Sequence, residues 1–579
     1  MKSTSTSPKR WLIAPKASPS HLQQYRGMGP ILAQVLYNRG FEEPLKAYEF
    51  LYAKEIQSSP FEMKGMANAV SRIRTAIRRR EPIIVYGDFD ADGVTSTVLL
   101  VSVLRALKAV VKPYIPHRID EGYGLNSHAL RKLAEAGAKV VITVDCGIRS
   151  VNEVEDGKDA GLAMIVTDHH SIGPQIPNAL AVLNPKQEDC KYPEDMLAGV
   201  GVAYRLAEAL LKAEAANNGA KGAASALTPD TLLDLVAIGT VADLAPLNRL
   251  ENRILVRRGL EVINRGQRPG VQAILDVSGI KAGSVNAGSI GFSIGPRINA
   301  AGRLESAMLA YDLLSSEKPD EALPWAEQLQ ALNVKRQDLT REAQETVRAQ
   351  LEQQQESASA LIFASHPGFL PGIVGLVAGR LAEEFFRPTV VMELGEHESR
   401  ASCRSIPQFD ITHALDRCAD LLLRHGGHAS AAGFTVLNEN IPALKRRLQE
   451  ITEDALRGQE LTPTIDVDAE LDLHQLTEDL CHELTLLEPT GYHNPAPVFV
   501  SRNLRVLEHR TVGKDSQHLK LRIARAGQPP LDAIGFGFGA WVANMPERID
   551  LAYQLEINEW NGRQSLQLNI QDIHHAGQG

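Results

Sequence analysis

Between residues 82 and about 185, short apolar runs alternate with stretches of helical character. PIIVYG, KVVITV and LAMIVT are such runs, and the segments GVTSTVLLVSVLRAL and SHALRKLAEAGA lie between or beside them. Apolar runs this short, separated by amphipathic helices, are typical of a parallel sheet that is buried on both faces. The sequence therefore predicts a doubly wound α/β domain.

Polar side chains gather where these apolar runs end. They follow three of the runs in chain order: Asp88, Asp90 and Asp92, then Asp145, then Asp168, His169 and His170. In a parallel α/β sheet, ligands bind beyond the carboxyl ends of the strands. We therefore expect the three clusters to meet at one edge of the sheet. Another acidic residue, Asp243, lies near the end of the apolar segment TLLDLVAIGTVADLAPL.

Three aspartates within five residues repel one another and lose solvation when buried, so a positive partner is expected. Carboxylates with one histidine suit Mg²⁺ or Mn²⁺ better than zinc or an iron–sulfur cluster. Five or six ligands are too many for one catalytic ion, whereas two ions about 3.5–4 Å apart can share them through a bridging carboxylate. The donors are Asp90, Asp92, Asp145, His169 and Asp243.

Blander interpretations exist for each residue alone. A single aspartate at a strand end is more often a helix cap than a metal ligand. A calcium loop of the EF-hand type needs Glu at its twelfth position, where this chain has Leu99. The occurrence of all these residues together, in order and at strand ends, favours the metal site.

The rest of the chain divides by pattern. Residues 318–358 are polar, rich in Gln and Glu, and carry apolar residues at helical spacing, which predicts a long connecting helix. A second α/β unit is expected over about 359–455, and its GGHASAAG segment is interpreted as a helix start with small residues. Residues 462–573 alternate polar and apolar residues, which predicts a small antiparallel barrel or sandwich.

Composition restricts the cellular setting. The net charge is −9, which argues against a basic coat over the whole surface, although SRIRTAIRRR at 71–80 and the segment 502–525 are basic. Five cysteines without a CxxC spacing fit a reducing compartment, so we expect a cytoplasmic protein. No stretch has the length of a membrane span, and the polar first 20 residues are expected to be a loose tail.

Several motifs together resemble one known family. GDFDADG, VDCG, TDHH and GTVADLAPL resemble the four motifs of the DHH phosphoesterase superfamily. INAAGRLESA, SCRSI, GGHASAAG and LEPTGYHNPAPVF resemble its RecJ branch, the single-strand-specific DNA exonucleases. The resemblance covers about residues 60–575. It implies an N-terminal segment (1–60), a DHH domain (61–317), a connecting helix (318–358), a DHH-associated nucleic-acid-binding domain (359–458) and an OB-fold domain (459–579).

The resemblance also implies roles for the clustered residues. Asp90 and Asp145, with Asp88, would hold one divalent ion. A second ion would lie among Asp92, Asp145, His169 and Asp243, with Asp145 bridging the two ions. His170 would contact the scissile phosphate, and Asp168 would orient a histidine. The expected cofactors are two Mn²⁺ or Mg²⁺ ions, and the expected reaction is 5′ to 3′ hydrolysis that releases 5′-mononucleotides in DNA repair and recombination.

DNA contacts are expected on both α/β units. The candidates are phosphate-binding arginines together with an asparagine and the GGH motif: Arg297, Asn299, Arg303, Arg380, Arg404, Gly426, Gly427 and His428. Each arginine alone is as readily a surface ion pair. The expected partners are single-stranded DNA, a helicase and a single-strand-binding protein, and the chain is expected to be a monomer.

Two other functions compete at this stage. One is a small-substrate DHH hydrolase, either a pyrophosphatase or a phosphodiesterase for oligonucleotides or cyclic dinucleotides, which needs the same metals. The other is a degenerate relative that acts as a scaffold in replication or repair. The extra N-terminal segment and the C-terminal barrel favour a polymer as substrate, and the complete set of metal motifs argues against degeneration.

Overall fold

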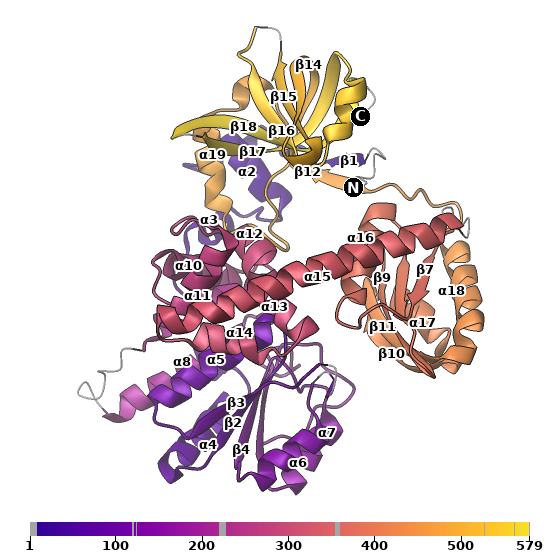
Figure 1. The fold of residues 1–579 in the computed structure, drawn as a ribbon. Coiled ribbons are helices and arrows are strands. Elements are labelled where there is room, and N and C mark those ends of the chain that lie inside the picture. The colour runs from indigo at the N-terminus through magenta and orange to yellow at the C-terminus, as the bar shows by residue number, and fades with distance from the viewer. Residues whose placement is uncertain are drawn as a thin grey trace. The chain divides into compact units, whose positions relative to one another are not determined.

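The computed structural model describes residues 9–118, 121–122, 124–218, 227–353, 359–525, 527–560 and 562–577 (Figure 1). The chain forms two compact units. One comprises Ala53–Asp338 with Pro489–Pro495, and the other comprises Met1–Tyr52, Leu339–Glu488 and Ala496–Gly579. Within these described ranges, no helix has both the length and the apolar character of a membrane-spanning helix.

The predicted parallel sheet forms the centre of the first unit. Its five strands are all parallel and follow the order β3-β2-β4-β5-β6. Their bounds are β2 Ile83–Gly87, β3 Val111–Tyr114, β4 Val140–Val144, β5 Ala163–Thr167 and β6 Ala181–Leu183. The three apolar runs become the central strands β2, β4 and β5, which are buried along nearly their whole length because helices cover both faces of the sheet.

Helices cover the two faces with separate apolar cores. Residues that alternate along a strand point to opposite faces, so Val85 packs in one core, with α4, α5 and α8, and Tyr86 packs in the other, with α6 and α7. The five helices are α4 Met66–Arg79, α5 Ala91–Ala106, α6 Ser127–Glu135, α7 Val151–Asp159 and α8 Gly199–Asn218. This arrangement confirms the doubly wound fold.

Helices complete the first unit and lead out of it. The polar segment predicted to be a connecting helix forms α15, Pro319–Gln353, and residues 354–358 of that prediction lie outside the described residues. Before it come α9 Leu233–Ala242, α10 Leu250–Asn264, α11 Pro269–Ser278, α12 Ala287–Ser289, a π-helix at Ile290–Ile294, α13 Gly295–Leu304 and α14 Met308–Ser315.

The second α/β region has a mixed five-stranded sheet in the order β10-β11-β9-β8-β7. The strands are β7 Ile362–His366, β8 Thr389–Glu393, β9 Glu398–Arg404, β10 Leu422–His428 and β11 Ala431–Leu437, and the helices are α16 Val374–Phe385, α17 Ile411–Asp416 and α18 Ile441–Leu456. The helix start predicted at GGHASAAG is wrong, because this segment forms the end of β10, the hairpin turn and the start of β11. Gly427 has φ +151° and Ala431 O lies 2.4 Å from the position of an added Cβ, so the hairpin requires glycine there.

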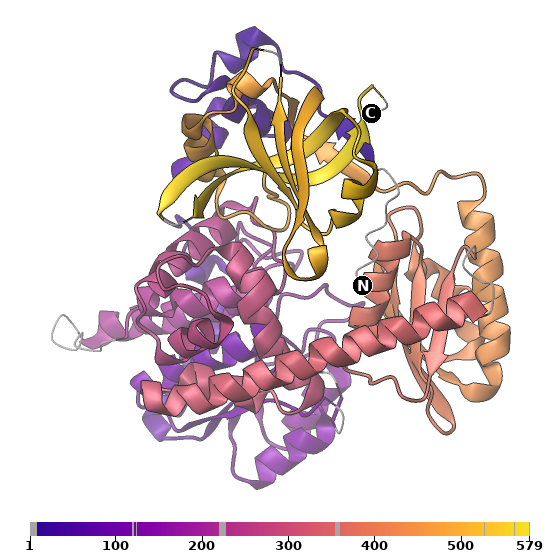
Figure 2. The same cartoon turned by 45° about the horizontal axis from the view of Figure 1, so that its top comes forward.

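The C-terminal strands form a closed sheet (Figure 2). β14 pairs with β15, β15 with β16, β16 with β18 and β18 with β17, and β17 pairs back onto β14. The β16–β18 pair is parallel, so the wholly antiparallel arrangement predicted from alternation is wrong at this pair. The strands are β13 Ala469–Glu470, β14 Phe499–Val512, β15 His518–Ala524, β16 Leu531–Gly535, β17 Arg548–Trp560 and β18 Arg563–His575, and α19 spans Glu478–Leu484.

The N-terminal segment packs against this closed sheet. Strand β1, Arg10–Ile13, pairs in parallel with β12, Thr464–Val467, so the expectation of a loose tail is wrong from residue 10 onward. Trp11 donates a hydrogen bond from Nε1 to Asp572 and stacks on His574. The pattern of apolar residues in so short a segment could not predict these contacts with distant residues. The helices α1 Pro19–Leu22, α2 Pro30–Asn38 and α3 Pro44–Tyr52 follow. The buried apolar residues of α2 and α3 share one core with strands β14–β18.

This shared core predicts that a substitution near the N-terminus loosens the C-terminal sheet. Leu36 on α2 is fully buried there, so we expect Leu36→Ala to destabilise this part of the protein by about 2–5 kcal/mol. Leu45 on α3 is 80% exposed, and the matched change Leu45→Ala should alter stability by less than about 0.5 kcal/mol. Hydrogen–deuterium exchange of the β14–β18 amides measures both effects. Unchanged exchange in Leu36→Ala would show that the two segments do not share a core.

Candidate metal centre

The strand ends of the first unit gather carboxylates and imidazoles at one edge of the sheet. β2 leads to Asp88, β4 to Asp145, and β5 to Asp168 and the two histidines. Asp243 joins them from the C-terminus of α9. Three groups have ligand atoms within 4.8 Å of one another: Asp88, Asp90 and Asp145; Asp92, His169 and Asp243; and Asp145, Asp168, His169 and His170.

The loop between β2 and α5 is fixed by hydrogen bonds. Asp90 is the N-cap of α5, and its Oδ1 accepts from the backbone N–H groups of Asp92 at 2.9 Å and Gly93 at 3.0 Å. Asn299 on α13 accepts from the backbone N–H of Ala91 at 2.7 Å. These contacts hold the three aspartates in one geometry although their charges repel.

The N-terminus of α8 holds the carboxylate of Asp92. The backbone N–H groups of Gly199 and Val200 donate to its two oxygens at 2.6 and 2.8 Å. Such N–H groups and the helix dipole favour a negative charge. Gly199 also permits a close approach, because an added Cβ would lie 2.6 Å from the Cβ of Asp145.

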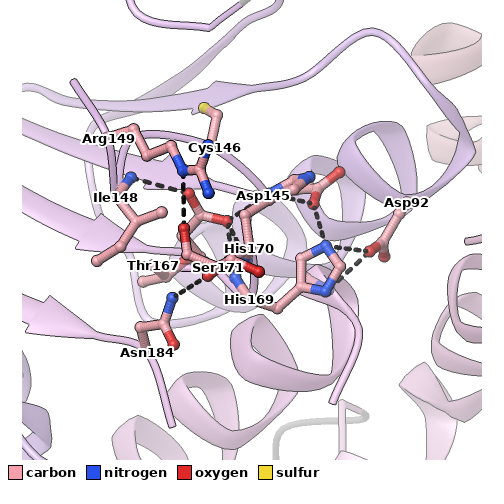
Figure 3. Close-up of polar contacts among 12 residues, drawn as sticks. Asp92, Asp145, Cys146, Ile148, Arg149, Thr167, His169, His170, Ser171 and Asn184 are labelled. Atoms are coloured by element: carbon pink, nitrogen blue, oxygen red, sulfur yellow. Dashed lines mark hydrogen bonds and ion pairs between the residues drawn. The ribbon is translucent and has the colours of Figure 1, made fainter. Parts of the chain in front are cut away.

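Asp145 belongs to two of these three groups, the one with Asp88 and Asp90 and the one with Asp168 and the two histidines. Its backbone has φ +61°, a left-handed conformation that a non-glycine residue adopts rarely and that is often found at functional sites. The side chain is 2% exposed, and its Oδ1 lies 3.0 Å from Nε2 of His169 (Figure 3). Among the described residues, neither of these two buried atoms has a hydrogen-bond partner. An unpartnered carboxylate oxygen facing an unpartnered imidazole nitrogen is a place for a cation.

Asp168 organises the two histidines. Its Oδ1 accepts from Nδ1 of His170 at 2.7 Å and from the backbone N–H groups of His169 and His170 at 2.7 and 3.0 Å. Its Oδ2 accepts from the backbone N–H of Ile148 at 2.8 Å. Burial opposes ionisation of Asp168, but the hydrogen bonds from His170 and from the backbone lower its pKa below the ordinary value.

Ionisation of the other carboxyl groups is unfavourable, because they are buried and lie close to one another. Burial, followed by repulsion from Asp90, raises the pKa of Asp92 from its ordinary 3.8 to about 7. Burial and neighbouring aspartates also raise the pKa values of Asp88, Asp145 and Asp243 well above the ordinary value. Burial lowers the pKa of His169 to about 3, so this imidazole is neutral and can donate its lone pair to a metal.

His170 differs from its neighbour. Burial lowers its pKa, but the hydrogen bond and charge of Asp168 outweigh burial and raise the pKa above the ordinary value. Its side chain is 41% exposed, against 12% for His169. One histidine is therefore neutral and enclosed, and the next is partly exposed and has a raised pKa.

The sequence reasoning missed two cations at this edge. Arg118 follows β3, lies over the ring of Phe89 at 4.7 Å, and has a charge that acts on Asp88 and Asp90. Lys186 follows β6, and its Nζ donates to the backbone carbonyl of His169. Both follow parallel strands of the same sheet, so the rule that located the aspartates could have located them too.

The predicted DNA contacts on α13 lie beside the aspartate loop. The side-chain oxygen of Asn299 accepts from the backbone N–H of Ala91, so it fixes the aspartate loop. Arg297 donates to Gln330 at 2.7 Å and to the carbonyl of Ser293 at 2.8 Å. Arg303 lies half-buried near the end of the same helix.

The other predicted contacts lie in the second unit. Arg404 ends β9, is half-buried, and donates to the carbonyl of Cys403 at 2.8 Å. Arg380 on α16 is exposed and donates to Gln344 at 3.3 Å. Gly426, Gly427 and His428 form the exposed end of β10, and the position of an added Cβ on Gly426 has no atom within 4 Å in the described part of the chain.

Comparison with known protein families defines the class of this fold and site. The family model of the DHH family, N-terminal domain, matches residues 82–240. The DHHA1 domain matches residues 358–454, and the RecJ OB domain matches residues 467–572. The chain therefore has the DHH phosphoesterase arrangement with the two domains that accompany it.

Comparison with curated relatives identifies the family within this class. The chain is 40% identical over 548 residues to the single-stranded-DNA-specific exonuclease RecJ of Bacillus subtilis, covering 94% of this chain and 68% of that protein. It is 36% identical over 565 residues to the RecJ of Salmonella typhimurium, covering 94% of this chain and 96% of that protein. The chain belongs to the RecJ family of single-stranded-DNA-specific exonucleases.

A solved structure shows the same architecture. RecJ from Thermus thermophilus in complex with Mn²⁺ superposes with a TM-score of 0.82 at 30% identity, covering 98% of this chain and 79% of that chain. The same Thermus protein has also been solved in complex with Mg²⁺. Family membership and the metal-bound relatives indicate a metal-dependent nuclease and favour it over the scaffold and small-substrate alternatives.

The packing at Gly199 predicts a sensitive position. We expect Gly199→Ala to lower the rate of single-strand digestion by about a hundredfold, because a displacement of about 1 Å at a reacting centre has that effect. The cause is the 2.6 Å approach of the new Cβ to Asp145. Gly173, where an added Cβ has no neighbour closer than 3.7 Å, provides the matched control Gly173→Ala. Equal rates in the two variants would mean that the α8 N-terminus does not constrain the centre.

Proposed function

We propose that two divalent cations bind at this centre and that the protein digests single-stranded DNA from the 5′ end, releasing 5′-mononucleotides. The observation that carries the proposal is Asp145, whose buried Oδ1 lacks a hydrogen-bond partner within the described ranges while its carboxylate adjoins ligand groups on two sides. A carboxylate in that position can bridge two ions about 3.5–4 Å apart.

The donors fit divalent cations. One site would use Asp88, Asp90 and Asp145, which form one compact group. The other would use Asp92, Asp145, His169 and Asp243, where Nε2 of His169 lies 3.6 Å from Oδ2 of Asp243. Carboxylate oxygens with one imidazole suit Mn²⁺ or Mg²⁺, and the raised pKa values of the aspartates reflect a charge that cations would neutralise.

When bound, two such ions supply Lewis acidity and positive charge for water attack on a phosphodiester. The protein's own residues fix where that charge lies. The α8 N-terminus holds Asp92, the N-cap bonds hold Asp90, and the left-handed backbone presents Asp145 between them. Holding ligands rigidly in this way lowers the reorganisation needed during the reaction.

His170 is suited to contact the substrate phosphate. Asp168 accepts a hydrogen bond from its Nδ1 and raises the pKa of the imidazole, and a protonated imidazole can donate to an anionic phosphate oxygen. Arg118 offers a second cation on the side of Asp88 and Asp90. Both cations would hold the phosphate that carries the scissile bond.

Further DNA contacts are proposed on both units. Arg297 and Arg303 on α13, and Arg380, Arg404 and the segment 426–428 in the second unit, are proposed to bind backbone phosphates. The closed C-terminal sheet is proposed to bind single strands, as folds of this class do. We also propose that a helicase and a single-strand-binding protein supply its substrate, and that the protein acts as a monomer in the cytoplasm, in keeping with its free cysteines.

End-labelled oligonucleotides test the activity and its polarity. With Mn²⁺, a 5′-labelled single strand should release labelled mononucleotide at the earliest times, whereas a 3′-labelled strand should shorten gradually. Asp145→Asn removes the bridging charge and should lower the rate by about a thousandfold. Asp159→Asn, on the exposed end of α7, is the matched control and should digest normally. Early mononucleotide release from the 3′ label would contradict the proposed direction.

Metal-free stability should depend on pH through the buried carboxyls. A carboxyl whose pKa is higher in the folded state stabilises the fold below its unfolded pKa, near 4, and that stabilisation is lost as the pH rises to the folded pKa. Asp92 has a folded pKa of about 7, so in EDTA the melting temperature should fall between about pH 4 and 7.

The control for this prediction is Asp92→Asn, which removes one of the titrating carboxyls and should make the fall smaller. Mn²⁺ added at pH 7.5 should raise the melting temperature of the wild type, since a ligand at a hundred times its Kd stabilises by about 2.7 kcal/mol. A melting temperature that does not respond to Mn²⁺ would contradict a metal centre at this position.

A further inference from the structure

The main chain of the two histidines has no helix or strand to hold it. β5 ends at Thr167, and residues 168–170 form no regular element. Both residues nevertheless have defined positions, because His169 faces Asp145 and His170 faces Asp168. Their backbone N–H and C=O groups therefore need partners elsewhere.

Side chains supply all four of these partners. Asp168 accepts from both N–H groups, of His169 at 2.7 Å and of His170 at 3.0 Å. On the carbonyl side, Nζ of Lys186 donates to His169 O. Nδ2 of Asn184 donates to His170 O at 3.0 Å (Figure 3). The backbone N–H and the backbone C=O of each histidine are therefore both hydrogen-bonded to a side chain.

The carbonyl partners come from one short segment, the 184–186 turn, which follows β6. Asn184 is fully buried, and its Oδ1 accepts from the backbone N–H of Lys186 at 2.9 Å. Gln187 is 4% exposed and donates from Nε2 to the carbonyls of Val182 at 3.0 Å and Asn184 at 3.1 Å. The turn is therefore rigid and anchored to the strand next to β5.

We propose that Lys186 and Asn184 are positioning residues that set the orientation of His169 and His170, and that Lys186 thereby controls divalent-cation affinity at the site of His169. This inference rests on the proposed function, because it assumes that His169 is a metal ligand. The residues act through the histidine backbone, and neither is proposed to touch the ion.

The charge of Lys186 and its hydrogen bond to His169 should have opposite effects on cation affinity. Its ammonium also faces Asp168, Asp195 and Asp243, so it places positive charge beside the cation site. If charge dominated, removal of the lysine would strengthen cation binding, since like charges repel. If position dominates, removal frees the His169 carbonyl and weakens binding, and residues that orient metal ligands typically change affinity by about 10–100-fold.

The test is a Mn²⁺ titration of the full-length protein, followed by electron paramagnetic resonance of the free ion. We expect Lys186→Met to weaken Mn²⁺ binding by about 10–100-fold. Lys186→Arg keeps a donor and the charge, and should recover most of the affinity. Lys191→Met, at an exposed lysine five residues along, is the matched control and should bind Mn²⁺ as the wild type does.

Asn184→Ala gives a second, independent measurement of the same turn. It should weaken Mn²⁺ binding by less than Lys186→Met, because Asn184 holds the carbonyl of His170 and not that of the proposed ligand. Far-UV circular dichroism in EDTA shows whether each variant is folded before the titration.

The outcomes separate this inference from the proposed function. A wild-type protein that does not bind Mn²⁺ would remove the proposed metal centre itself. Wild-type binding with equal or tighter binding by Lys186→Met would leave the centre intact and overturn the positioning role. Weaker binding by Lys186→Met that arginine does not restore would also overturn it, because a retained donor should suffice.

Discussion

Repulsion among buried carboxylates is the constraint on which this structure depends. Asp88, Asp92 and Asp145 are each at most 3% exposed, and burial together with mutual repulsion raises their pKa values. A fold does not retain such a cluster for stability, since isolated buried charges are strongly unfavourable. Cations within the cluster would stabilise it, so the proposed metal centre accounts for the arrangement of the sheet edge, the α8 N-terminus and the α9 C-terminus.

The protein holds these groups through its backbone. Parallel strands deliver the aspartates and histidines to one edge, helix N-termini and caps fix Asp90 and Asp92, and side chains fix the histidine peptides. The left-handed Asp145 and the close approach at Gly199 are local departures from favourable geometry. They occur where the centre needs them, which is the usual distribution of backbone strain in enzymes.

Prediction from the sequence succeeded where the spacing of apolar residues fits a single type of structure. The strands of the DHH sheet and the edge that gathers Asp88, Asp145 and His169 followed from short apolar runs and the topology rule. It failed at the GGH hairpin, because small residues permit a tight turn as readily as a helix start. It also failed at β1, where four residues form a strand only because distant residues 464–467 provide the partner. Lys186 was missed because the strand-end rule was applied to carboxylates and histidines and not to the lysine that follows β6.

The central claim is that Asp145 bridges two divalent cations, and anomalous diffraction from crystals grown with Mn²⁺ tests it most directly. The account predicts two anomalous peaks about 3.5–4 Å apart, one beside Asp88 and Asp90 and the other beside Asp92, His169 and Asp243, with the Asp145 carboxylate between them. A single peak, or two peaks of which one does not adjoin Asp145, would contradict it.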